Sequence, residues 1–216
     1  KPCQSGKTFV MLEEIIRKFE EIPRADGKEN INVVICDNNL LLVNQTCSRI
    51  DGSAELSAFS TTEGKTYIQF SSVAEKKKKT SKKHELGSKT LEKVIYNTTF
   101  KNIHNIVCCA HPTRFGNISE IVDAFQGQTH LNGKYHFTIW IDEADKHVGQ
   151  IKKNFIPLLE KHPCVSLKFL TATPDKINEE WLGMQVKALK DPVLDTYHGW
   201  EDNDIKFFEE AQNNIT

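Results

Sequence analysis

A short segment near the start of the sequence has the residue types that bind a nucleoside triphosphate. Ser5-Gly6-Lys7-Thr8 opens an amphipathic helical pattern. Backbone N–H groups at a helix N-terminus bind phosphate oxygens. In such a loop Lys7 would reach the β- and γ-phosphates, the Thr8 hydroxyl would bind Mg²⁺, and Gly6 would let the backbone approach closely. The expected cofactor-binding residues are Cys3, Gln4, Ser5, Gly6, Lys7 and Thr8.

Two observations leave other interpretations of this segment open. Ser5 or Thr8 could simply cap the following helix without binding any phosphate. The first glycine of the G-x-x-x-x-G-K-[ST] pattern falls at position 1, where the sequence has Lys1. This departure keeps a module that holds nucleotide without turnover among the alternatives.

An apolar strand that ends in adjacent carboxylates is the second candidate segment. Residues 138–141, TIWI, run directly into Asp142-Glu143-Ala144-Asp145. Downstream of a phosphate loop, Asp142 would hold Mg²⁺, and Glu143 would orient and deprotonate the attacking water. The alternative is that these carboxylates cap the helix that follows.

A third apolar strand ends in hydroxyl side chains. The strand expected at 166–170 runs into Thr171-Ala172-Thr173-Pro174. The hydroxyls of Thr171 and Thr173 could touch the carboxylates and sense the γ-phosphate. A plain strand-end turn, with Pro174 starting the next helix, is the alternative.

Strand-like and helix-like segments alternate along the chain and must position these motifs. The predicted strands are 31–36, 66–73, 106–110, 137–141 and 166–170, and the predicted helices are 9–22, 39–50, 89–97, 116–127, 148–162 and 175–183. This alternation predicts an α/β fold with a mostly parallel sheet and helices on both faces. The carboxyl ends of parallel strands meet at one edge, where ligands of open α/β sheets bind.

Composition excludes several classes of protein. The 216 residues include 28 Lys and Arg against 29 Asp and Glu, which excludes a uniformly basic nucleic-acid coat. No apolar run approaches the roughly 18 residues that a spanning helix needs, so we expect no membrane partner. Six cysteines lack any C-x-x-C pair, which predicts free thiols in an intracellular compartment: cytoplasm, nucleus, or a virion or viral factory.

Two further features are interpreted as structural or solvated. The eight histidines, His147 among them, have no ligand spacing with cysteines or carboxylates. The lysine-rich run at 75–84 is interpreted as a solvated loop, with a nucleic-acid contact or an import signal as alternatives.

In this order, the three motifs resemble those of superfamily-two helicases and translocases of the DEAD/DEAH-like, viral type. Gly6-Lys7-Thr8 matches motif I, Asp142-Glu143-Ala144-Asp145 matches motif II in its D-E-A-D form, and Thr171-Ala172-Thr173 matches motif III. The resemblance covers residues 1 to about 183. It implies a RecA-like P-loop NTPase that binds ATP and Mg²⁺.

Weaker matches lie where the family contacts the nucleic-acid backbone. Asp37-Asn38-Asn39 takes the place of motif Ia, and Pro112-Thr113-Arg114 lies near motif Ib. The resemblance therefore implies nucleic-acid contacts by Asn38, Asn39, Thr113 and Arg114. The P-T-R-E-L-A and T-P-G-R forms of these motifs are absent, so the similarity is to the wider superfamily rather than to true DEAD-box RNA helicases.

The resemblance also implies a domain organisation and a function. Residues 1–190 would be the first RecA-like lobe without its first strand, and 191–216 an exit segment toward a second lobe of a longer chain. ATP hydrolysis would drive movement on, or unwinding of, DNA or RNA, weakly or not at all in the isolated lobe. The alternatives are a DNA-packaging ATPase of the terminase type and a non-catalytic nucleotide-binding module.

Overall fold

The chain divides into two compact units, Lys1–Thr173 and Pro174–Thr216. The computed structural model describes residues 11–15, 26–52, 67–70, 85–86, 94–95, 104–171 and 177. All of these except Ile177 belong to the first unit. The predicted domain boundary near residue 190 and most of the helix predicted at 175–183 lie outside the described residues.

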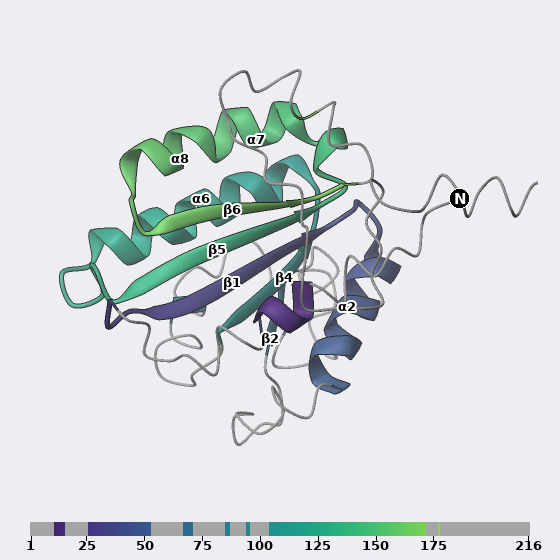
Figure 1. The fold of residues 1–216 in the computed structure, drawn as a ribbon, viewed down its shortest axis with the longest axis horizontal. Coiled ribbons are helices and arrows are strands. Elements are labelled where there is room, and N and C mark those ends of the chain that lie inside the picture. Colours follow the sequence, from purple (N-terminus) through teal and green to yellow (C-terminus); the bar gives the residue numbers. More distant parts are fainter. Residues whose placement is uncertain are drawn as a thin grey trace, which may run out of the picture. The chain divides into compact units, whose positions relative to one another are not determined.

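A sheet of six parallel strands forms the centre of the first unit (Figure 1). Its strand order is β3-β2-β4-β1-β5-β6, and every neighbouring pair is parallel. The strands are β1 (Glu29–Cys36), β2 (Tyr67–Phe70), β3 (Glu85–Leu86), β4 (Asn105–Cys109), β5 (Tyr135–Asp142) and β6 (Val165–Leu170). The prediction of an α/β fold with a parallel sheet is confirmed, and the short strand β3 is an addition to it.

The central strands are buried because both faces of the sheet are covered. In β1, the run from Asn30 to Cys36 is buried throughout, as expected for a strand between two layers of helices. Val33 lies beside Ile106 of β4 on one side and Ile139 of β5 on the other. This apolar, β-branched row is what made these strands recognisable in the sequence.

Helix α2 (Leu40–Gly52) covers one face of the sheet together with the helical residues 11–15. The shared core cluster contains Val34, Cys36, Trp140 and Leu170 from the strands, Val43, Cys47 and Ile50 from α2, and Met11 and Ile15. The segment 11–15 lies within the helix predicted at 9–22.

Helices α6 (Pro112–Gly127), α7 (Val148–Asn154) and α8 (Ile156–Lys161) cover the opposite face. Phe125 of α6 meets Phe137 of β5 edge to face, with ring centroids 5.4 Å apart. Phe115 of α6 packs on Phe155, between α7 and α8, at 5.3 Å. The structure therefore has helices on both faces of its sheet.

One predicted helix, 148–162, is two helices in the structure. The break falls at Phe155, between α7 and α8. Pro157 has no N–H to give to the carbonyl of Lys153, so the helical bonding cannot continue through it. At the same break, the Asn154 carbonyl accepts a hydrogen bond from the Ser119 hydroxyl of α6 at 3.0 Å.

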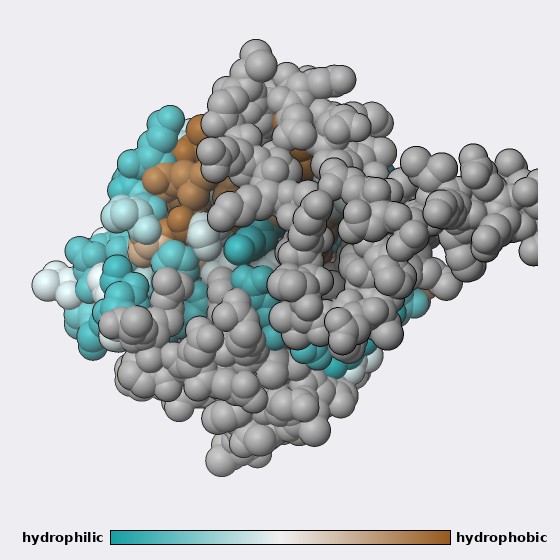
Figure 2. Space-filling view, viewed as in Figure 1, coloured by the Kyte–Doolittle hydropathy of each residue, from teal (hydrophilic) through white to brown (hydrophobic). Residues whose placement is uncertain are grey.

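The outer edge of β6 is only partly covered by the described residues. Residues 166–169 are half-buried, and among the described strands β6 pairs with β5 alone. Figure 2 shows hydrophobic surface over α8 and β6 in this view. None of the described helices is long and apolar enough to cross a bilayer.

Candidate functional site

The candidate site lies where the strand order of the sheet reverses. From β1 the chain passes through α2 to β2 on one side, whereas from β5 it passes through α7 and α8 to β6 on the other. Ligands of open α/β sheets bind outside the carboxyl ends of the strands at such a point. Because Ile35 and Ile141 are partners in the register, Asp37 and the residues from Asp142 onward leave the sheet side by side.

The turn after β5 holds Glu143 in an unusual backbone conformation. Its φ of 50° and ψ of 45° are left-handed, and it is the one non-glycine residue with positive φ among those described. For a residue with a Cβ this conformation costs about 1–2 kcal/mol. The Asp142 carboxylate accepts the Glu143 N–H at 3.1 Å, and the Glu143 carbonyl accepts the Lys146 N–H at 2.9 Å. Such strain concentrates at functional sites.

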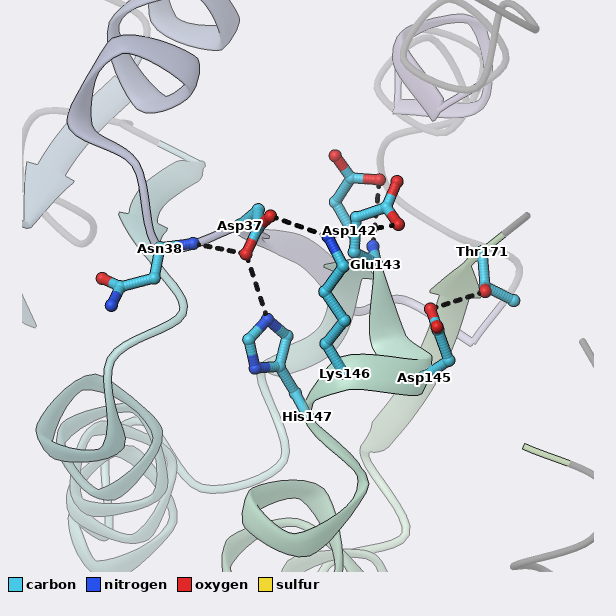
Figure 3. Close-up of polar contacts among 8 residues, drawn as sticks. All are labelled: Asp37, Asn38, Asp142, Glu143, Asp145, Lys146, His147 and Thr171. Atoms are coloured by element: carbon cyan, nitrogen blue, oxygen red, sulfur yellow. Dashed lines mark hydrogen bonds and ion pairs between the residues drawn. The ribbon is translucent and has the colours of Figure 1, made fainter. Parts of the chain in front are cut away.

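The turn after β5, residues 142–147, is called the acidic turn, and it is tied to the end of β6. The Thr171 hydroxyl donates to the Asp145 carboxylate at 2.7 Å (Figure 3). Contact between a hydroxyl of the third strand and the acidic motif was expected from the sequence, and Asp145 is the carboxylate that makes it. Thr173, the other hydroxyl predicted there, lies outside the described residues.

The acidic turn is also tied to the end of β1, through the Asp37 carboxylate. Lys146 Nζ lies 3.0 Å from Asp37 Oδ2, His147 Nε2 lies 3.6 Å from Oδ1, and the Asn38 N–H donates to Oδ1 at 2.8 Å. Partial burial opposes ionisation of Asp37. The hydrogen bonds from Lys146 and Asn38 and the charges of Lys146 and His147 outweigh it, so the pKa of Asp37 is lowered.

Lys146 lies between two carboxylates. Its Nζ is 3.7 Å from Glu143 Oε2, in addition to the contact with Asp37. The hydrogen bond to Asp37 is the main reason that the pKa of Lys146 is raised, and the charges of Asp37, Glu143 and Asp145 add to it. The predicted general base and the predicted nucleic-acid loop therefore share one cation.

The residues expected to touch nucleic acid differ in their exposure. Asn38, Asn39 and Thr113 are exposed, and the Asn39 carboxamide caps α2 by accepting the Leu41 N–H at 2.9 Å. Arg114 is only 5% exposed, and its guanidinium donates to Asn117 of the same helix at 3.1 Å. In this conformation Arg114 is turned away from solvent.

Sequence reasoning did not identify Lys146 and His147 as parts of the site. The side chain of His147 is 13% exposed, and its ring centroid lies 5.9 Å from that of Phe115 in α6. Their contact with Asp37 spans about half of the chain, which no local spacing rule can reveal. The available signal was the convergence of strand ends, which brings whatever follows β1 next to whatever follows β5.

The predicted phosphate loop, residues 3–8, lies outside the described residues. The helical segment that follows it is described in part. Met11 and Ile15 share the core cluster with Leu170 at the end of β6, and Glu14 lies 3.5 Å from Lys168 of that strand. Within the described ranges, no group of three or more His, Cys, Asp or Glu residues could hold a metal ion.

Comparison of the chain with protein-family models, curated proteins and solved structures found no match.

Proposed function

We propose that this chain is the ATP-binding lobe of a nucleic-acid-dependent ATPase, a helicase or translocase with a P-loop NTPase fold. The observation that carries the proposal is the position of Asp142 and Glu143. Asp142 is the last residue of the inner strand β5 and Glu143 follows it, where the strand order reverses, between Asp37 after β1 on one side and Thr171 after β6 on the other. Open α/β sheets bind their ligands at such an edge.

The proposed reaction is transfer of the γ-phosphoryl group of ATP to water. The water oxygen attacks phosphorus, the bond to the β,γ-bridging oxygen breaks, and ADP leaves. Glu143 accepts the proton of the water, and its half-buried carboxylate is suited to holding that water. Asp142 and Thr8 would hold Mg²⁺, which would neutralise negative charge on the phosphates during the transfer.

The phosphate-binding role falls to residues 3–8. The proposal puts Lys7 on the β- and γ-phosphates, as in a P-loop. It is supported by the place of Met11, three residues after Thr8, in the core cluster that also contains Leu170, the last residue of β6.

Nucleic acid is proposed to contact Asn38, Asn39 and Thr113. All three are exposed at the same edge of the sheet: Asn38 and Asn39 lie on the loop after β1, and Thr113 lies in the first turn of α6, which follows β4. Contacts of this kind act on the phosphate backbone and give little sequence preference. Arg114 joins them only if its guanidinium leaves Asn117.

The test of this proposal is ATP hydrolysis by the full-length protein, with and without single-stranded DNA, single-stranded RNA and duplex. Glu143→Gln should reduce kcat by about 100- to 10,000-fold, the usual contribution of a general base, and should leave ATP binding intact. Glu120→Gln, an exposed substitution in the middle of α6, is the matched control and should leave kcat unchanged.

Two outcomes would contradict the proposal. Unchanged turnover in Glu143→Gln would show that Glu143 is not the general base. ATP binding by the wild-type protein without turnover under any condition would favour the non-catalytic binding module that Lys1 keeps open.

A further inference from the structure

The carboxyl ends of β1 and β4 carry a pair of cysteines that the proposed function does not use. Cys36 is the last residue of β1, Cys109 is the last residue of β4, and the two are partners in the parallel register. Lateral neighbours in a sheet lie about 4.8 Å apart. A disulfide usually joins Cα atoms about 4.4–6.8 Å apart, so the backbone holds this pair within bonding range.

Both thiols belong to the same face of the sheet. Cys36 is a member of the core cluster beneath α2, and Cys109 packs against that cluster. Because side chains alternate between the two faces of a strand, Cys108 belongs to the opposite face. Cys36 and Cys109 are therefore the two cysteines that the pairing of β1 with β4 brings together.

The two thiols differ in their access to solvent. Cys36 is 3% exposed, whereas Cys109 is half-buried. Burial is the main reason that the pKa of Cys36 is raised to about 12, so this thiol stays protonated and is not the first to react. It donates a hydrogen bond to the Thr46 hydroxyl at 3.4 Å, and a thiol is a weak donor, so little is lost when it turns away. An oxidant from solvent reaches Cys109 first.

We propose that Cys36 and Cys109 form a reversible thiol–disulfide pair that a hydroperoxide oxidises. The Cys109 sulfur attacks one peroxide oxygen, the O–O bond breaks, and the other oxygen leaves as water or an alcohol with the thiol proton, which gives a sulfenic acid. The Cys36 sulfur then attacks the Cys109 sulfur, the S–O bond breaks, and water leaves with the Cys36 proton. The two thiols lose two electrons, and the peroxide gains them.

The disulfide would join two segments that leave the sheet at the candidate site. Asp37 follows Cys36 directly, and the Ala110 N–H donates to the Cys36 carbonyl at 2.7 Å. The new bond would fix the loop after β1 to the segment after β4. A dithiol would release it again by exchange. The chemistry uses no nucleotide, so this inference is independent of the proposed function.

The test exposes the full-length protein to hydrogen peroxide. The remaining thiols are then blocked with N-ethylmaleimide in denaturant, and tryptic peptides are mapped by mass spectrometry. Cys36 lies in peptide 29–49 and Cys109 in peptide 102–114. The expected product is these two peptides joined by one disulfide, and the link should disappear after treatment with dithiothreitol.

Substitutions assign the link, because each of the two peptides contains a second cysteine. Cys36→Ala and Cys109→Ala should each abolish the linked product. Cys47→Ala and Cys108→Ala are the matched controls, also at buried positions, and should retain it. In Cys36→Ala the sulfenic acid of Cys109 has lost its partner and should be trapped by dimedone. A thermal melt of each reduced variant identifies any loss of folding.

Three outcomes would overturn the inference. The link could persist in folded Cys36→Ala or Cys109→Ala, or the wild-type protein could form no link while Cys109 is oxidised to the sulfinic acid. The third is a link found only in a dimer on a non-reducing gel, which would join two copies of the chain. Since the readout is a covalent mass, absence of ATP hydrolysis would overturn the proposed function and leave the thiol pair in place.

Discussion

Strands β1 and β5 carry polar side chains at both ends, and the two ends differ in how these side chains are held. At the amino ends, Asn30, Asn32 and Thr138 are at most 2% exposed. At the carboxyl ends, Asp37 and Glu143 are half-buried and ionisable. The same two strands thus contain a polar group built into the interior and a polar group open to a ligand.

The amino-end group is a network of neutral side chains that satisfy one another. Asn30 donates to Asn32 at 2.8 Å, Asn32 donates to Asn105 of β4 at 3.3 Å, and Thr138 donates to Asn30 at 2.9 Å. Ser166 of β6 donates to Thr138 at 3.4 Å. Buried polar groups are tolerated when they are paired in this way.

The carboxyl-end group is charged and half-buried, whereas the amino-end group is neutral and buried. The carboxylates of the carboxyl-end group pair with charged partners that are partly or largely exposed, and this group includes the strained Glu143 and keeps the exposed Lys146. The contrast separates a buried group of neutral, paired side chains from a charged and more accessible group at the other ends of the same two strands.

The largest expected effect on stability is at the amino end. Asn32→Leu removes the partner of Asn30, Asn105 and the more distant Trp140 indole, so the free energy of unfolding should fall by about 2–4 kcal/mol. Urea denaturation measures the change. Asn44→Ala removes one hydrogen bond, which the Gln69 side chain donates to the exposed Asn44 carboxamide oxygen, and should cost under about 1 kcal/mol. Equal losses in the two variants would show that the network adds nothing beyond single bonds.

A smaller effect of opposite sign is expected at the carboxyl end. Glu143→Gly should raise the free energy of unfolding by roughly 0.5–1 kcal/mol, because glycine adopts the left-handed conformation without strain. In the regular helix α6, Glu120→Gly should lower it by about 1 kcal/mol. Chemical denaturation of both variants gives the comparison, and a loss of stability in Glu143→Gly would mean that the turn is not strained.

The smallest effect concerns acid. The pKa of Asp37 lies below its ordinary value of 3.8, so its contribution to stability is present above that pH and is lost as pH falls through the lower, folded value. When the pH is lowered from about 5 to 2, the free energy of unfolding should therefore fall by about half a kcal/mol less in Asp37→Asn than in the wild-type protein. Thr138→Val, at the neutral end, should lose the same stability at every pH. An unchanged acid dependence in Asp37→Asn would place the acid-sensitive groups elsewhere.

The sequence was sufficient to predict the strands and the edge of the sheet at which the motifs meet. Five strands were recognisable as apolar, β-branched runs, and a parallel arrangement followed from their alternation with helices. Strand β3 was missed because two residues after a lysine-rich run carry no periodic pattern. The break between α7 and α8 was missed although Pro157 stands in the sequence.

Side-chain placement at the site was harder to predict. The left-handed turn at Glu143 could not be predicted, because no glycine occupies that position. The burial of Arg114 depends on the rotation of α6 about its axis. The contact of Lys146 with Asp37 depends on the register between β1 and β5, and a slip of one residue would turn every side chain of a strand to the other face.

The network at the amino ends bears on that register. Asn105, Asn32, Thr138 and Ser166 are lateral partners, one from each of four adjacent strands. A slip of β1 by one residue would replace Asn32 in this row by Ile31 or Val33, so the observed alignment is preferred over its nearest alternatives. That alignment also sets how far each strand projects at the other end, where Asp37 and Asp142 emerge. Substitutions at Asn32 or Thr138 would thus displace the side chains of a candidate site that these two residues never touch.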